Sequence, residues 1–337
     1  MTAESFCKMI WNYSYSTVQS KIAQKKYKTI SIPKRNGFRE LSFLDPKTDL
    51  HMLQSGLVNF LKKIELPVCA KGFVKGESYL SYLEHHIGSI HFLRLDIKDF
   101  FPSITRKLIE REISCFMSFD SEEEKKKIVK LVSDLVTYHN CLPQGAVSSP
   151  VISNIVMIRI DQRILKYCQV LGIKYTRYAD DLLFSSEEFD FNDKKWFLRK
   201  IKHIVSDGNF KINYGKLKSS TREISLNGYV ISHEGLRLSR QRLNDIKKVV
   251  SFASSNRQML QSDPNSYVQA LNQLNLEHRG LSVYPFKSVY QFYQFLCGYR
   301  SYLISFLKYD IESQFRKKLC KLLDKLEKII KQIASVL

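Results

Sequence analysis

The segment from Thr176 to Ser185 limits the possible folds of this chain more than any other stretch. β-forming tyrosines precede a short polar turn and an apolar run follows it, which predicts strand, tight turn and strand. The turn carries two adjacent carboxylates, Asp180 and Asp181. Two like charges at such a turn repel each other and are costly to desolvate, and a divalent cation offsets both effects. Taken alone, however, the pair is explained more simply by a solvated turn.

A second stretch, from His91 to Pro102, changes that interpretation. Its apolar run predicts a strand, which Asp96 interrupts near the C-terminal end. A carboxylate inside an apolar strand is unexpected unless it is paired or binds a metal. If this strand lies beside the hairpin, Asp96 meets Asp180 and Asp181. Three converging carboxylates suit a pair of Mg²⁺ ions about 4 Å apart, which activate an attacking hydroxyl and stabilise a leaving pyrophosphate.

Three segments, in this order and spacing, resemble the motifs of bacterial reverse transcriptases, and the retron type is the subgroup they suggest. Leu95 to Ile104 is similar to the first catalytic motif of these enzymes. Leu142 to Pro150, with Asn154 beyond it, is similar to their LPQG…SP…N motif. Tyr178-Ala179-Asp180-Asp181 is similar to their YADD box. The resemblance starts at about Tyr27 and extends into the helical C-terminal region.

The resemblance implies an α+β fold, a right-hand polymerase with fingers, a ferredoxin-like palm and a helical thumb. We expect a helical extension over residues 1–26, fingers over 27–90, the palm over 91–235, and the thumb with a basic C-terminal helix over 236–337. A helical fingers insertion is expected within the palm at about 104–140.

The resemblance implies that Asp96, Asp180 and Asp181 are the catalytic and metal-binding residues of a nucleotidyltransferase. It also assigns Phe101 as the steric gate that excludes a ribose 2′-hydroxyl, and Gln144 as a contact of the incoming nucleotide. Taken alone, Phe101 would be read as a core aromatic and Gln144 as part of an ordinary loop.

Basic residues complete the predicted nucleotide site. Asn-Gly between two β-like runs predicts a hairpin, and Lys34 and Arg39 cluster around its turn. Clustered cations on a rigid hairpin suit a triphosphate, although taken alone they are explained more simply by an ordinary charged hairpin tip. The resemblance assigns both residues to the nucleotide phosphates. It assigns Lys216 to the pyrophosphate, with Lys218 as the alternative.

The resemblance therefore implies RNA-directed DNA synthesis, in which a 3′- or 2′-hydroxyl of a primer attacks the α-phosphate of a dNTP. For the retron type it further implies a dedicated structured non-coding RNA as template and primer, a single-stranded DNA product, and anti-phage defence with a separate effector protein.

Three alternatives remain open. Retron enzymes usually carry an Asn-Ala-x-x-His box where this chain has Tyr82 to His86, and Val-Thr-Gly where it has Leu226 to Gly228. Both differences favour a non-retron defence reverse transcriptase with untemplated or repetitive synthesis. A group II intron maturase is less favoured, because no zinc-endonuclease cysteines follow the thumb. A non-catalytic RNA-binding scaffold that regulates an effector is disfavoured by the intact aspartates.

Composition agrees with a nucleic-acid partner. The formal net charge is +20, from 53 Lys and Arg against 33 Asp and Glu, and such an excess favours a polyanion. Seven scattered cysteines form no zinc or disulfide pattern, so we expect reduced thiols and a cytoplasmic protein. No signal peptide or transmembrane segment is expected, since no apolar run approaches 18 residues.

Helical spacing of apolar residues predicts helices over 1–26, 48–64, 104–140 and 195–209. Ser121 and Ser149 are the expected N-caps of two of the helices, and Trp196 is expected to pack inward.

Two aromatics of the C-terminal region, Phe295 and Tyr299, are expected in the core rather than as stacking platforms. The basic tail from Arg316 predicts an amphipathic helix. Thumb packing, association with a partner and membrane-surface binding are its three readings, in that order.

Overall fold

The computed structural model describes the chain except for residues 25, 34–36, 275–284 and 310. The described chain forms two compact units. The first unit contains Met1–Tyr82, Leu93–Ser185 and Phe189–Ser219. The second unit contains Leu83–Phe92, Ser186–Glu188 and Ser220–Leu337.

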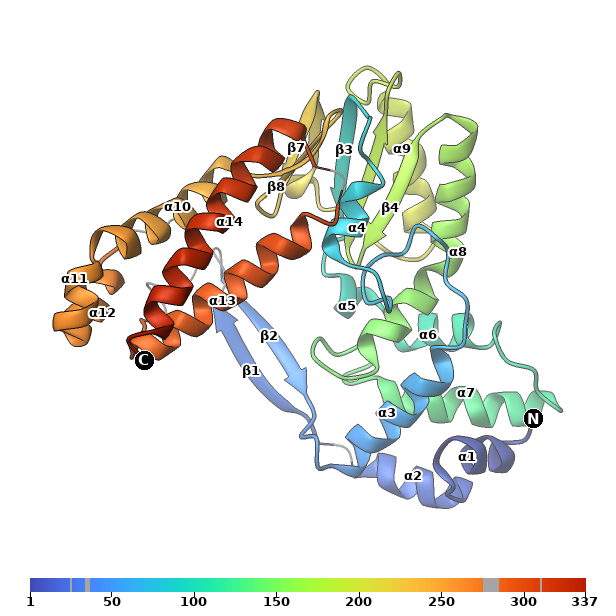
Figure 1. Ribbon diagram of the computed structural model, residues 1–337. Coiled ribbons are helices and arrows are strands. Elements are labelled where there is room, and N and C mark those ends of the chain that lie inside the picture. Colours follow the sequence, from blue (N-terminus) through green and yellow to red (C-terminus); the bar gives the residue numbers. More distant parts are fainter. Residues whose placement is uncertain (25, 34–36, 275–284, 310) are drawn as a thin grey trace. The chain divides into compact units, whose positions relative to one another are not determined.

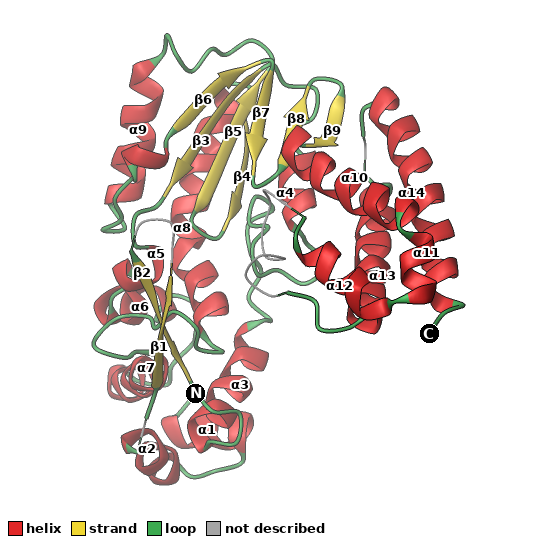
Figure 2. Ribbon diagram, turned by 90° about the vertical axis from the view of Figure 1, so that its left-hand side faces the viewer, coloured by secondary structure: helices red, strands yellow, loops and turns green. Residues whose placement is uncertain are grey.

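A four-stranded sheet with the order β4-β5-β3-β6 carries the acidic residues (Figure 2). Its strands are β3 (His91–Asp96), β4 (Lys174–Tyr178), β5 (Asp181–Ser186) and β6 (Lys218–Thr221). β4 and β5 pair antiparallel with Tyr178 opposite Asp181, so the turn between them contains only Ala179 and Asp180. The predicted strand, turn and strand are confirmed. β3 lies next to β5, as the convergence of the carboxylates requires.

Two helices, α8 (Ser149–Val170) and α9 (Lys195–Ser206), pack on one face of this sheet (Figure 1). Phe184 of β5 lies edge-to-face against Phe197 of α9, with ring centroids 5.4 Å apart. Phe197 is fully buried, whereas Trp196 is 43% exposed, so the predicted inward packing of Trp196 is wrong by one position. The N-cap of α8 is also one residue earlier than predicted, at Ser148.

The remaining elements of the first unit are mostly short helices. They are α1 (Ala3–Trp11), α2 (Tyr15–Ala23), α3 (Asp49–Leu61), α5 (Phe100–Ser103), α6 (Arg106–Ile113), α7 (Glu122–Val136) and the 3₁₀ turn η1 (Tyr214–Lys216). A two-stranded antiparallel ribbon, β1 (Lys28–Pro33) and β2 (Phe38–Phe43), forms the predicted hairpin. α4 (Tyr79–Glu84) follows in the chain after the Gly72 loop.

Two predicted long helices are each divided in the structure. Residues 1–26 form two helices, because Asn12 adopts a left-handed φ of 57° that ends α1, and Ser14 then caps α2. Residues 104–140 divide into α6 and α7. Ser121 caps α7 as predicted, with its hydroxyl accepting from the Glu124 backbone N–H at 3.2 Å.

The second unit combines a small sheet with helices. Its antiparallel strands are β7 (Glu223–Leu226), β8 (Tyr229–Ser232) and β9 (Gly235–Leu238). Its helices are α10 (Arg240–Ser255), α11 (Arg257–Ser262), α12 (Pro264–Asn272), α13 (Val289–Phe306) and α14 (Ser313–Ala334). The apolar stripe of α14, including Leu319 and Leu326, is buried against α10 and α13. This packing supports the first reading of the basic tail.

All seven cysteines are free thiols. Among the helices that the structure describes, none combines the length and the apolar character that crossing a bilayer requires.

Candidate active site

The two acidic stretches meet at one end of the sheet. Asp96 ends β3 and is only 2% exposed, and the next backbone N–H, of Ile97, donates to the Asp180 carbonyl oxygen at 2.9 Å. The Asp96 carboxylate accepts from Asn213 Nδ2 at 3.1 Å and from Lys216 Nζ at 2.8 Å. The structure therefore brings together carboxylates that lie far apart in the sequence.

A cavity of about 560 Å³ opens at this junction, entirely within the first unit. Its lining includes Asp96 and Asp180 together with four of the residues predicted for the nucleotide, namely Arg39, Phe101, Gln144 and Lys216. Lys34, the other predicted phosphate contact, lies outside the described residues. Thus one cavity is lined by acidic groups, cations, aromatic rings and amides, among them most of the residues predicted for the nucleotide.

Asp181 is held differently from the other two aspartates, by an arginine that the sequence did not suggest. Arg94 lies two residues before Asp96, so its side chain is on the same side of β3. Its Nη2 donates to Asp181 and lies 3.4 Å from Asp96, while Nη1 lies 3.3 Å from the Lys216 carbonyl oxygen. The alternation of strand residues, which places Arg94 and Asp96 on the same side of β3, is the signal in the sequence that could have identified this contact.

Burial and mutual repulsion disfavour the ionised forms of the two carboxyl groups in the turn. Burial raises the pKa of Asp181 to about 6; the neighbouring Asp180 also raises it, and Arg94 opposes the shift. Burial likewise raises the pKa of Asp180, and the charge of Asp96 adds to this effect. Ionising these groups together is therefore unfavourable without additional positive charge.

The donor set fits a divalent cation, although the side chains are not preassembled around one. Among the described residues, no three acidic, histidine or cysteine side chains are grouped as a metal cage. One reason is visible, because Arg94 binds Asp181 and Lys216 binds Asp96. Carboxylate oxygens from Asp96 and Asp180 on one cavity are the hard ligands that Mg²⁺ prefers, and the raised pKa values indicate missing positive charge.

A buried network supports the acidic turn from below. Arg177 and Asp161 are both fully buried, and the guanidinium bonds both carboxylate oxygens at 2.7–3.0 Å. Arg177 also donates to the Ala179 carbonyl oxygen and to Asn154 Oδ1, each at 3.1 Å. The Asn154 amide in turn donates to the Gly72 carbonyl oxygen at 2.9 Å. Three segments of the chain, namely α8, the end of β4 with its turn, and the Gly72 loop, are thus joined by this network.

The turn itself needs a close backbone neighbour. Ala179 has a left-handed φ of 56°, which is costly for any residue except glycine. Gly72 packs directly against it, since a Cβ at this position would lie 2.5 Å from the Ala179 nitrogen. The Lys71 backbone N–H donates to the Arg177 carbonyl oxygen at 2.8 Å and keeps the two segments together.

A second glycine contact fixes the Gln144 loop to the β-ribbon. Gly145 has a φ of 114°, and a Cβ there would lie 3.2 Å from the Ser42 carbonyl oxygen. The Ser42 backbone N–H donates to the Gln144 carbonyl oxygen at 2.8 Å. Gln144 and Arg39 are therefore placed on the same cavity by one backbone connection.

Comparison with known proteins decides the family. The model of the family described as "Reverse transcriptase (RNA-dependent DNA polymerase)" matches residues 22–231. The chain belongs to the reverse transcriptase family. The motif-based prediction of a retron-type reverse transcriptase is confirmed by relatives that carry this name.

The retron Ec86 reverse transcriptase of Escherichia coli is 32% identical over 241 residues, which cover 70% of this chain and 68% of that protein. The retron Mx162 reverse transcriptase of Myxococcus xanthus is 34% identical over 47% of this chain, but over only 35% of its own length. An RNA-directed DNA polymerase is thus the enzyme class that the relatives support. Reverse transcriptases generally depend on divalent metal.

Solved structures agree on the fold. The apo telomerase of Candida tropicalis matches 92% of this chain and 62% of its own, with a TM-score of 0.51 at 12% identity. The telomerase of Candida albicans in complex with a fragment of telomeric RNA matches 94% of this chain and 65% of its own, with a TM-score of 0.50 at 14% identity. The predicted α+β right-hand polymerase fold is confirmed.

Proposed function

We propose that this reverse transcriptase copies a dedicated structured non-coding RNA into single-stranded DNA, as the retron type implies. The observation that carries the proposal is the convergence of Asp96 and Asp180 with Arg39, Gln144 and Lys216 around one cavity. The retron relatives support the subgroup.

We assign the metal of this site as Mg²⁺, held by Asp96 and Asp180, with Asp181 beside them. When bound, the ions would supply charge neutralisation at the phosphates and activation of the primer hydroxyl. The contribution of the chain is to keep these carboxylates at one end of a rigid sheet. Arg177 and Gly72 fix the turn, and Asn213 orients Asp96.

The other lining residues fit roles around a dNTP. Arg39 offers a planar fork for phosphate oxygens, and Lys216, about half exposed, offers a mobile charge or proton for the leaving pyrophosphate. Gln144 offers both donor and acceptor groups to the nucleotide. We assign Phe101, which lines the cavity with its ring centroid 6.2 Å from that of Phe73, to the exclusion of a ribose 2′-hydroxyl. Phe73, with its left-handed φ of 61°, was not predicted as a site residue.

The biological setting is proposed on the same resemblance. We assign the protein to anti-phage defence in the bacterial cytoplasm, with a separate effector protein as partner. A non-retron defence enzyme is the second candidate, and the motif differences at Tyr82–His86 and Leu226–Gly228 favour it. Sequencing the nucleic acid that co-purifies with the protein separates the two. A defined RNA with a matching DNA copy supports the retron assignment, and repetitive or untemplated DNA supports the alternative.

Primer extension on an RNA template tests the proposed chemistry. Wild-type protein with Mg²⁺ and dNTPs is expected to extend the primer, and Asp180→Asn is expected to lose at least about a thousandfold of the rate. Asp193→Asn, an exposed aspartate of the same unit, is the matched control and should retain the wild-type rate. If Asp180→Asn extends primers normally, the assignment of the site is wrong. If it loses extension but keeps full biological activity, the non-catalytic scaffold is the correct function.

A further inference from the structure

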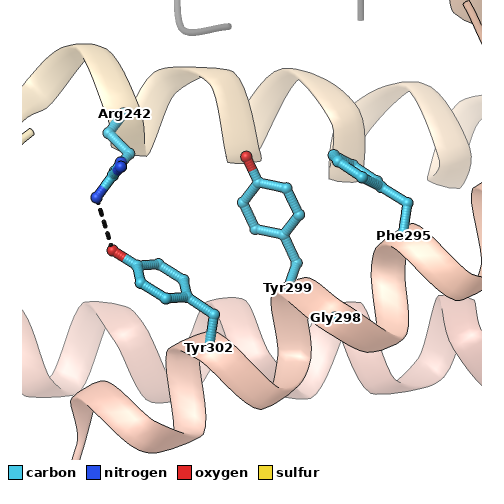
Figure 3. Close-up of a pocket in the computed structure, with 5 residues that line it drawn as sticks. All are labelled: Arg242, Phe295, Gly298, Tyr299 and Tyr302. Atoms are coloured by element: carbon cyan, nitrogen blue, oxygen red, sulfur yellow. Dashed lines mark hydrogen bonds between the residues drawn. The ribbon is translucent and has the colours of Figure 1, made fainter. Parts of the chain in front are cut away.

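The second unit contains an aromatic pocket that the polymerase chemistry does not use. Phe295, Tyr299 and Tyr302 follow one another on one side of α13, and Gly298 leaves a gap between them (Figure 3). With Arg242 of α10 they line a pocket of about 370 Å³. The prediction that Phe295 and Tyr299 belong to the core is wrong, since both are only partly buried and line this pocket.

Arg242 is the polar group of this pocket. Its guanidinium lies 4.8 Å from the ring centroid of Tyr229 and 5.6 Å from that of Tyr302, and Nη1 donates to the Tyr302 hydroxyl at 3.0 Å. Within the described chain, no carboxylate forms an ion pair with Arg242, and Asp245, one turn further along α10, is buried and outside the lining. The guanidinium is therefore held in place by aromatic rings, and none of the described carboxylates pairs with its charge.

The aromatic rings and the Arg242 guanidinium together indicate which class of ligand the pocket can bind. Planar aromatic side chains stack on the faces of unpaired bases, and a fixed guanidinium pairs with phosphate oxygens. A volume of about 370 Å³ is at the lower end for small-molecule sites, which suits a single nucleotide. A base inside a duplex offers no free face, so the pocket favours single strands.

We propose that this pocket binds one unpaired nucleotide of a single-stranded nucleic acid. The base stacks on Tyr299, whose ring meets that of Phe295 edge-to-face with the centroids 4.6 Å apart, and its phosphate pairs with Arg242. The proposal rests on the proposed function only for the origin of the strand, which is the RNA template or the DNA product. If Arg242 merely fastens Tyr229 to Tyr302, filling the pocket leaves nucleic-acid binding unchanged.

Gly298→Leu is the sharpest test of the pocket. A Cβ at Gly298 meets no atom within 4 Å, so this position of the pocket lining has open space for a side chain. Replacing a glycine within a helix also favours helix formation. The matched control is Ser305→Leu, an exposed position seven residues further along α13 that does not line the pocket. Thermal unfolding of both variants verifies that the fold is intact.

The probes are short RNA and DNA oligonucleotides that each contain one 2-aminopurine, with a blunt duplex as the comparison. Binding is measured in EDTA without dNTPs, so the result does not depend on polymerisation. Because neither metal nor dNTP is present, the outcome is independent of the catalytic assignment, which primer extension by Asp180→Asn tests separately. Wild type and Ser305→Leu should quench the 2-aminopurine of a single strand. Quenching of only the RNA or only the DNA probe supports the proposal and identifies the origin of the strand.

Gly298→Leu is expected to weaken single-strand binding roughly 5-fold to 100-fold, the range of a lost base–aromatic stack, and to abolish quenching. Arg242→Gln should weaken binding and reduce the salt dependence by about one phosphate contact. Duplex affinity should be the same in all variants. The proposal is overturned if Gly298→Leu quenches and binds single strands like the wild type, or if it loses duplex affinity to the same extent.

Discussion

Two arginine–aspartate pairs lie on either side of the acidic turn, and they differ in burial. Arg177 and Asp161 are both fully buried, whereas the side chains of Arg94 and Asp181 are 19% and 14% exposed. Removing one member of a buried pair leaves a charge that water cannot reach, so such a pair resists exchange. A pair that reaches solvent can exchange its partners. The first pair is therefore a fixed support, and the second is a contact that an incoming cation can replace.

The hydrogen bonds of the two arginines agree with this difference. Arg177 has three kinds of acceptor around it, a carboxylate, an amide oxygen and a backbone carbonyl, all at 2.7–3.1 Å. Arg94 shares one nitrogen between two acidic groups, and burial of those groups is only partly offset, as the raised pKa of Asp181 indicates. Arg177 therefore neutralises the charge of Asp161, whereas Arg94 only partly neutralises Asp181 and Asp96.

The largest loss of stability is expected when the buried Arg177–Asp161 pair is broken. Arg177→Met should lower the free energy of unfolding by about 3–5 kcal/mol, because Asp161 is left buried without its cation. The matched substitution Arg94→Met should cost less than Arg177→Met, since its pair is partly solvated. Urea denaturation of both variants measures the difference. Equal costs would show that the two pairs are energetically alike.

A smaller loss of stability is expected for a substitution at Gly72, which packs against the backbone of Ala179. Gly72→Ala places a Cβ 2.5 Å from the Ala179 nitrogen, so the turn must shift. We expect a loss of about 1–3 kcal/mol in the free energy of unfolding, typical of overpacking, together with slower primer extension. Gly298→Ala is the control and should be neutral or slightly stabilising, because its Cβ meets open space. If Gly72→Ala has the stability and primer extension of the wild type, Gly72 does not stabilise the turn.

The incomplete neutralisation of Asp181 predicts that the affinity for a divalent cation depends on pH. With a pKa raised to about 6, Asp181 is largely ionised at pH 7 and largely protonated at pH 5. A divalent cation must then compete with the proton, so its apparent affinity should fall by roughly tenfold from pH 7 to pH 5. Calorimetric titration with Mg²⁺ measures this change, and circular dichroism at each pH verifies that the protein stays folded. A pH-independent affinity contradicts the proposed charge deficit.

The smallest effect is expected for Mg²⁺ affinity when Arg94 is replaced. Arg94→Met removes a cation that competes for Asp181 and Asp96, so Mg²⁺ affinity should rise roughly threefold. Arg94→Lys keeps the charge and should leave the affinity near that of the wild type. The same Mg²⁺ titration detects both changes. Weaker binding by Arg94→Met would mean that Arg94 organises the carboxylates rather than competing for them.

Local patterns singled out the carboxylates that the structure brings to one end of the sheet, and the resemblance to reverse transcriptases was needed to assign them a role. The two carboxylates of the turn interrupt β-forming residues, and Asp96 interrupts an apolar strand, so both stand out from their neighbours. The resemblance to reverse transcriptases then supplied Gln144 and Lys216, which line the same cavity.

The supporting residues were not predicted, because their roles depend on which segments become neighbours. Arg177 is an ordinary strand arginine until α8 places Asp161 against it, and Gly72 is an ordinary loop glycine until Ala179 packs on it. The aromatics of α13 show the same limit. Helical spacing identifies an apolar stripe, but not which of its residues become fully buried, and Tyr299 instead lines a pocket that it shares with Arg242 of α10.

The central claim is that Asp96 and Asp180 together hold the divalent cation of a polymerase site. Titration of Mn²⁺ by electron paramagnetic resonance, on wild type, Asp96→Asn, Asp180→Asn and the control Asp193→Asn, tests it most directly. We predict that each substitution in the cavity weakens binding by at least about tenfold, because a charged ligand is lost, while the control binds like the wild type. Unchanged Mn²⁺ binding by Asp96→Asn and Asp180→Asn would contradict the claim.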